Sequence, residues 1–73
     1  MRQIVQVKTK ENYQLEVIFA DNEKKIVDIT PLLFGAVFEP LKDEKEFAKA
    51  SLDPVLGTVV WPNGADIAPE YFE

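Results

Sequence analysis

The feature that most limits the fold of this chain is the complete absence of cysteine and histidine from its 73 residues. A domain of this size buries only about 60% of the surface of its unfolded chain, and its core contributes a net stability of roughly 3–5 kcal/mol. Disulfides, metal ions or a partner subunit often add to this in natural domains. Without cysteine or histidine, disulfides and the usual zinc sites are excluded. We therefore expect close packing, with a homodimer as the remaining common source of stability.

The composition is that of a globular domain, with 47% hydrophobic and 29% charged residues. No repeat, low-complexity tract or linker interrupts the sequence, so we interpret residues 1–73 as a single domain. No apolar run approaches the roughly 18 residues that indicate a membrane span, and no signal peptide is recognisable at the N-terminus. The sequence therefore predicts a cytoplasmic protein with no membrane partner.

The charge balance argues against one class of partner. The net charge is −5, from eight basic and thirteen acidic residues. Such a surface repels a phosphate backbone unless its basic residues are segregated, and here the lysines are spread among acidic residues. We therefore do not expect this domain alone to bind nucleic acid.

The N-terminal part predicts a three-stranded antiparallel meander over residues 4–9, 13–19 and 24–29. In the first segment, alternation places Val5 and Val7 on one face. The second segment alternates most clearly, with apolar residues at Tyr13, Leu15, Val17 and Phe19. Such a sheet has one apolar face, which needs a covering layer.

Short helices are expected to form that layer. In "TPLLFG", Thr30 can cap a helical turn, Pro31 suits its first position and Gly35 suits a left-handed stop. The apolar side chains of this turn are expected to plug the sheet: Leu32, Leu33 and Phe34.

A second helix is predicted over residues 44–50, because Asp43 and Glu46 have the spacing of a capping box. The β-branched run "VLGTVVW", residues 55–61, is expected to join the sheet. The predicted fold class is α+β. Its antiparallel sheet combines the N-terminal meander with one or two C-terminal strands and is covered on one face by short helices.

The C-terminal stretch "TVVWPNGADIAPEYF" contains turn chemistry. Pro62, Asn63 and Gly64 favour a chain reversal, and we expect Asp66 to hold that turn by accepting backbone N–H bonds. The "ADI" segment that follows could pair briefly as an edge strand. Pro69 then begins a terminal helical turn.

The same stretch holds the candidate interaction surface. Aromatic side chains are favoured anchors at interfaces, but in so small a domain a tryptophan at a strand end often completes the core. The residues weighed between these two roles are Trp61, Tyr71 and Phe72.

A catalytic interpretation would use Asp66 or Asp28 as an acid or base beside Thr58 or Tyr71. The chain offers no histidine, no phosphate-binding glycine loop and no second carboxylate at motif spacing. We therefore predict no catalytic residues.

Two groups of acidic residues are candidate oxygen ligands for calcium or magnesium: Asp43 with Glu44 and Glu46, and Asp21 with Glu23. The twelve-residue calcium loop with its central glycine is missing. We therefore predict no metal site and no cofactor.

Three stretches in order carry a family resemblance: "YQLEVIFADNEKKIVDITPLL", "GAVFEPLKDEKEFAKASLD" and "GTVVWPNGADIAPEYF". Together they resemble the bacterial domain of unknown function 2442 family (DUF2442). The most specific part is the series Trp61, Pro62, Asn63, Gly64 and Asp66. At Asp21-Asn22 the sequence departs from the Asp-Gly that is usual in the family.

The resemblance implies an α+β fold without established catalytic residues. It also implies a setting, since members are often encoded beside another small protein in an arrangement like toxin–antitoxin pairs. Some longer relatives append a helix-turn-helix domain. The leading hypothesis is a non-enzymatic module, antitoxin-like or accessory, that binds another small protein.

Two other functions stay open. One is a small-ligand-binding or enzyme domain with a pocket between the sheet and the layer formed by Phe34 and Phe47, lined by Trp61. The other is a transcription-associated regulator.

Overall fold

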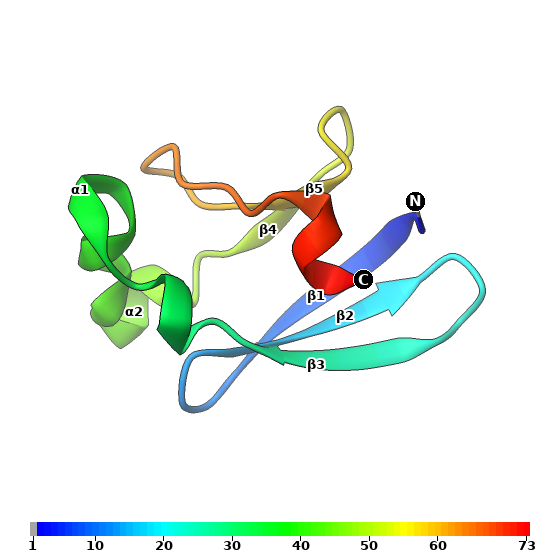
Figure 1. Ribbon diagram of the computed structural model, residues 1–73, viewed down its shortest axis with the longest axis horizontal. Coiled ribbons are helices and arrows are strands. Elements are labelled where there is room, and N and C mark those ends of the chain that lie inside the picture. The colour runs from blue at the N-terminus through cyan, green and yellow to red at the C-terminus, as the bar shows by residue number, and fades with distance from the viewer. Residues whose placement is uncertain (1) are drawn as a thin grey trace.

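The computed structural model describes residues 2–73, so Met1, which the predicted domain includes, lies outside the described residues. Figure 1 shows a three-stranded meander on one side and a smaller sheet with short helices on the other. The fold class is α+β, which confirms the prediction. With η marking a 3-10 helix, the elements are β1 (Ile4–Lys10), β2 (Gln14–Phe19), β3 (Lys24–Asp28), η1 (Thr30–Leu32), α1 (Gly35–Phe38), η2 (Glu39–Lys42), α2 (Glu44–Phe47), β4 (Ser51–Asp53), β5 (Thr58–Val60) and η3 (Pro69–Phe72).

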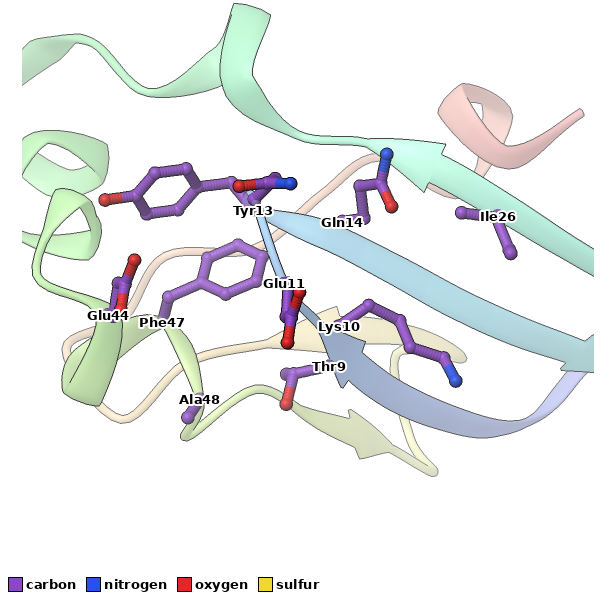
Figure 2. Close-up of a pocket in the computed structure, with 10 residues that line it drawn as sticks. Thr9, Lys10, Glu11, Tyr13, Gln14, Ile26, Glu44, Phe47 and Ala48 are labelled. Atoms are coloured by element: carbon purple, nitrogen blue, oxygen red, sulfur yellow. The ribbon is translucent and has the colours of Figure 1, made fainter.

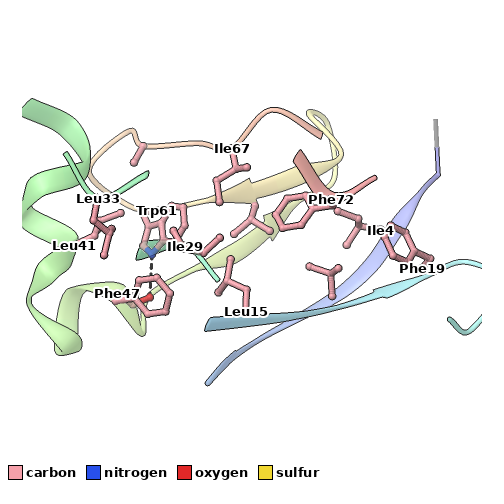
Figure 3. Packing of buried hydrophobic residues seen from close by; sticks show 13 residues of the cluster. Ile4, Leu15, Phe19, Ile29, Leu33, Leu41, Phe47, Trp61, Ile67 and Phe72 are labelled. Atoms are coloured by element: carbon pink, nitrogen blue, oxygen red, sulfur yellow. Dashed lines mark hydrogen bonds between the residues drawn. The ribbon is translucent and has the colours of Figure 1, made fainter. Parts of the chain in front are cut away.

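The meander has the predicted order β1-β2-β3 and is antiparallel throughout. Its central strand alternates as expected, because Leu15, Val17 and Phe19 are at most 1% exposed while the residues between them are less buried. In Figure 3 the buried side chains fill the space between the meander and the second layer. The apolar face of the meander therefore forms the floor of the core.

Strand β1 contains a bulge that the alternation of the sequence does not reveal. Ile4 pairs with Phe19, whereas Gln6 pairs with Ile18, so Val5 is an extra residue in the register. The bulge turns Ile4 into the core at 3% exposure and leaves Val5 47% exposed. The prediction that Val5 shares the inner face with Val7 is therefore wrong.

Tyr13 lies in the β1–β2 turn and not in the strand where it was predicted. Asn12 and Tyr13 both have φ of 59°, in the left-handed region that bulky residues rarely adopt. The Tyr13 hydroxyl donates to the Lys42 carbonyl, and its ring meets Phe47 edge to face with centroids 5.4 Å apart. These contacts with the helical layer compensate for the unfavourable backbone conformation.

The exit from β3 is held by Asp28, not by the predicted cap Thr30. The Thr30 backbone N–H donates to the Asp28 carboxylate at 3.0 Å. This bond, and after it a bond from the Thr30 side chain, lower the pKa of Asp28 below its ordinary value. Pro31 occupies the first turn of η1 as predicted.

The chain after η1 continues into a helix that was not predicted. Gly35 has the expected left-handed conformation, with φ of +83°, but it begins α1 and does not end the apolar turn. Leu33 is buried and Leu32 packs against the core, whereas Phe34 is 70% exposed. The prediction that Phe34 plugs the sheet is therefore wrong.

Helix α2 is shorter than the predicted 44–50. Asp43 caps it by accepting the Lys45 N–H at 3.0 Å, but Glu46 forms an ion pair with Lys49 at 2.8 Å and does not complete a capping box. The chain leaves the helix after Phe47, whose side chain is buried, and soon enters β4. No helix in residues 2–73 has the length and apolar character needed to cross a membrane.

The C-terminal strand pairs differently from the prediction. β5 covers only Thr58–Val60 and forms a separate two-stranded sheet with β4, in which Leu52 pairs with Val59. It does not join the meander. Val55 and Leu56, assigned to the strand by their β propensity, lie in the β4–β5 turn because Asp53 and Gly57 close the chain there. The second layer thus consists of this small sheet and the short helices.

We predict that Asp28 stabilises the fold at neutral pH and stops doing so in acid. Because folding lowers the pKa of Asp28, its contribution is complete above the ordinary pKa of Asp and is lost as the pH falls through the lower folded-state value. Asp28→Asn keeps an oxygen acceptor and removes the charge. Urea unfolding should show a less stable variant at about pH 7, and the difference should shrink towards about pH 2. An equal difference at both pH values would contradict this role.

Candidate functional site

The predicted interaction surface begins with Trp61, which the structure places in the core. Its side chain is 3% exposed, and its indole N–H donates to the Phe47 carbonyl at 2.9 Å. Its ring also contacts Phe47 and Phe38, with centroids 5.8 and 6.1 Å away. Figure 3 shows this hydrogen bond crossing from the small sheet to the helical layer. Trp61 therefore joins the two parts of the second layer and offers no free ring to a partner.

The turn after Trp61 is held by Asn63. The Gly64 N–H donates to the Trp61 carbonyl at 3.0 Å, and the Trp61 N–H donates to the Ala65 carbonyl at 2.9 Å. The Asn63 side chain accepts the Ala65 N–H at 3.1 Å and donates to the Val37 carbonyl at 2.9 Å. The turn is thereby tied to α1. The prediction that Asp66 holds this turn is wrong, because Asn63 occupies that role and uses both atoms of its amide.

Asp66 instead lies beside β5, where its side chain takes no part in the turn. Its backbone forms a bridge with Val60, as the expected pairing of "ADI" requires. Ala65 and Ile67 on either side are 1% and 2% exposed, so the Asp66 side chain faces solvent. Within residues 2–73 its carboxylate accepts no hydrogen bond and forms no ion pair. It borders a hollow of about 280 Å³ whose other lining residues are Leu56, Thr58, Ile67, Ala68 and Pro69.

The other two aromatic candidates both lie in the terminal turn η3, but they differ in burial. Phe72 is completely buried, whereas Tyr71 is 37% exposed and its hydroxyl donates to the Asp28 carbonyl at 3.1 Å. The Lys25 ammonium donates to the main-chain oxygens of Phe72 and Glu73 at 3.1 and 2.9 Å. Of the three predicted surface residues, only Tyr71 therefore exposes part of its ring, because Trp61 and Phe72 are needed to fill the core.

The side chains weighed as catalytic are mostly engaged in the fold. The buried Thr58 hydroxyl donates to the Ile67 carbonyl, and Asp28 accepts the Thr30 N–H. Thr58 and Asp66 line the same hollow, but the Thr58 hydroxyl has its proton committed to the main chain. The geometry thus provides no activated nucleophile at this position.

The acidic groups weighed as metal ligands also have structural partners. Asp21 accepts the Glu23 N–H and pairs with Arg2 at 3.2 Å, and these contacts lower the pKa of Asp21. Asp43 caps α2, and Glu46 pairs with Lys49. Among residues 2–73, no group of three potential ligands is close enough to hold a metal ion.

A hollow that the sequence did not indicate lies at the tip of the β1–β2 hairpin (Figure 2). It has a volume of about 880 Å³ and combines the rings of Tyr13 and Phe47 with the carboxylates of Glu11 and Glu44. Of the residues named for the predicted ligand pocket, it includes Phe47 but not Trp61. Its position depends on the left-handed Tyr13, which no periodicity in the sequence signals.

The sequence also did not reveal which apolar side chains are exposed. Val55 and Leu56 in the β4–β5 turn are 91% and 55% exposed, Phe34 just before α1 is 70% exposed, and Val37 within α1 is 45% exposed. The sequence predicts Val55 and Leu56 in a strand and Phe34 against the sheet, and it gives no prediction for Val37. The detectable signal was the Asp-Pro and Gly that flank Val55 and Leu56, which are typical turn residues.

These features define a small α+β domain whose core is closed by its C-terminal segment. The family model described as "Protein of unknown function (DUF2442)" matches residues 4–73. The chain therefore belongs to this family, which confirms the resemblance. Comparison with curated proteins and with solved structures gives no match.

We predict that Asn63 and Asp66 differ sharply in their effect on stability. Asn63→Ala removes the bonds to Ala65 and Val37 and should lower the free energy of unfolding by about 1–2 kcal/mol. Asp66→Ala removes no bond within the fold and should change it by less than about 0.5 kcal/mol. Urea unfolding measures both values. The reverse ranking would restore Asp66 as the residue that holds the turn.

Proposed function

We propose that this domain is a non-enzymatic module that binds another small protein, as the antitoxin-like or accessory member of a pair. The observation that carries this proposal is the β4–β5 turn, the loop at the top of Figure 1. It presents Val55 and Leu56, 91% and 55% exposed, on the outside of the second layer. A partner that covers these two apolar side chains would remove them from water, which favours binding.

The turn is held in one conformation by its own hydrogen bonds. The Asp53 carboxylate accepts the N–H groups of Val55 and Leu56 at 2.8 and 3.0 Å. The Gly57 N–H donates to the Asp53 carbonyl at 2.7 Å, and Gly57 has a φ of +70°. A preformed turn loses little conformational entropy on binding, which favours its use in recognition.

The non-enzymatic character is supported by the use of the polar side chains. Asp28, Thr58 and Asn63 each make hydrogen bonds that hold the fold together. Every buried side-chain nitrogen or oxygen in residues 2–73 has a hydrogen-bond partner within the fold, so none of them is left unpaired for a substrate.

A second candidate function is small-ligand binding in the hairpin hollow. The left-handed conformation of Tyr13 beside this hollow favours it, because a bulky residue in that region is strained and such strain is frequent at functional sites. A thermal-shift screen against metabolites tests this alternative. The alternative fails if no compound raises Tm, or if Glu44→Gln leaves every observed shift unchanged.

Co-expression with the product of the adjacent gene tests the leading proposal. The two proteins should co-elute in size exclusion, and Val55→Ser with Leu56→Ser should separate them, because the substitutions remove the apolar contact and leave the Asp53 hydrogen bonds in place. Circular dichroism verifies that the variant is folded.

The matched control is Ile26→Ser, which removes an apolar side chain that is 58% exposed on the outer face of the meander. This variant should still co-elute with the neighbouring protein. Separate elution of the unsubstituted domain, or co-elution that survives the double substitution, would contradict the proposal.

A further inference from the structure

Asp66 is the charged residue of the C-terminal motif that the fold does not use. Trp61, Asn63 and Gly64 each make hydrogen bonds that close the turn. The Asp66 carboxylate makes none within residues 2–73, and Asp66→Ala is expected to leave stability almost unchanged. A side chain with no structural role at a fixed position is a candidate for an intermolecular contact.

The position of Asp66 is fixed by the main chain around it. The Ile67 N–H donates to the Val59 carbonyl at 3.1 Å, and the Ile67 carbonyl accepts the buried hydroxyl of Thr58. Together with the bridge to Val60, these bonds hold the backbone on both sides of Asp66 against β5. The backbone of Asp66 is therefore held in place, and its side chain is one of those that line the hollow.

The walls of this hollow are mainly apolar. Leu56, Ile67, Ala68 and Pro69 surround a volume of about 280 Å³, with the carboxylate of Asp66 at the edge. A mainly apolar hollow with one carboxylate among its lining side chains suits a side chain with an aliphatic stem and a cationic head. Arginine and lysine have this construction, and they bury the stem while the head stays at the surface.

The charge distribution indicates the sign of the charge on a partner. Residues 51–73 contain four acidic residues and no lysine or arginine, so they carry −4 of the net charge of −5. The acidic residues are Asp53, Asp66, Glu70 and Glu73. This end of the chain attracts a basic surface and repels an acidic one.

The basic side chains of the domain do not neutralise Asp66. Arg2 pairs with Asp21 and Glu23, Lys49 pairs with Glu46, and Lys25 donates to the main chain of η3. No ion pair within residues 2–73 includes Asp66. The Asp66 carboxylate is therefore available for an ion pair with a cation of another molecule.

We propose that the hollow between Leu56 and Pro69 binds an arginine or lysine side chain of a partner protein, with Asp66 pairing with its cationic head. Val55, adjacent to Leu56 and 91% exposed, would contact apolar residues next to that cation. This inference rests on the proposed function and adds to it the chemistry of the partner. The partner segment is basic and apolar, and the contact partly shields the ion pair from water, which strengthens it.

The test uses two peptides that differ only in charge. The probe is acetyl-Gly-Leu-Arg-Leu-Gly-amide, and its control carries citrulline, which is neutral and nearly identical in shape, in place of arginine. In an NMR titration of the ¹⁵N-labelled domain, the arginine peptide should bind with a Kd of about 1 mM and shift the amide signals of Leu56, Thr58, Ile67 and Ala68. The citrulline peptide should bind about tenfold more weakly.

Two protein variants separate this site from general attraction between charges. Asp66→Asn should weaken binding of the arginine peptide about tenfold, whereas Glu70→Gln, which removes an exposed carboxylate outside the hollow, should change it by less than about twofold. Equal binding of the two peptides, equal effects of the two substitutions, or no binding of the arginine peptide would each overturn the inference. An Asp66-dependent dimer of the domain alone would also overturn it, because the cation would then come from a second copy.

This test fails separately from the test of the proposed function. If the neighbouring protein co-elutes and the Val55→Ser, Leu56→Ser variant separates them, but the two peptides bind equally, the interaction module is supported and the cation site is ruled out. If the arginine peptide binds and Asp66→Asn weakens it, but the neighbouring protein does not co-elute, the cation site is supported and the proposed complex with that protein is ruled out.

Discussion

The fold depends on the hydrogen bond from the Trp61 indole to the Phe47 carbonyl, which ties the small sheet to the helical layer. No helix in residues 2–73 exceeds four residues, so none is stable through its own hydrogen bonds. They keep their places because their apolar side chains pack in one cluster with Trp61 and the meander. This shared cluster, in which Trp61 links the small sheet to the helical layer, takes the place of the disulfide or metal that other domains of this size use.

This use of the aromatic residues determines where a partner can bind. Trp61 and Phe72 are part of the core, and removing either from it would cost more stability than so small a domain has in reserve. The proposed contact with a partner therefore uses side chains that the core does not need. Val55 and Leu56 on a preformed turn and Asp66 beside its hollow are such side chains, and they lie at the same end of the second layer.

The sequence predicted those parts of the fold that depend on local chemistry. The alternation in β2, the proline in η1, the positive φ of Gly35 and the cap at Asp43 all follow from neighbours in the chain. The remaining features depend on contacts between distant segments. Asn63 accepts a local bond from Ala65, two residues on, but its second bond, to the Val37 carbonyl 26 residues away, needs the amide N–H that an aspartate lacks. The left-handed Tyr13 likewise depends on Lys42 and Phe47.

The central claim, that Trp61 ties the small sheet to the helical layer, is tested most directly by hydrogen exchange of its indole N–H. If this proton is held between the two parts of the layer, it exchanges only when the whole domain unfolds. Its protection should then equal that of the amides in the central strand β2, with the same dependence on low concentrations of urea. Rapid exchange of the indole proton while the β2 amides stay protected would show that the segment opens by itself, and would contradict the account.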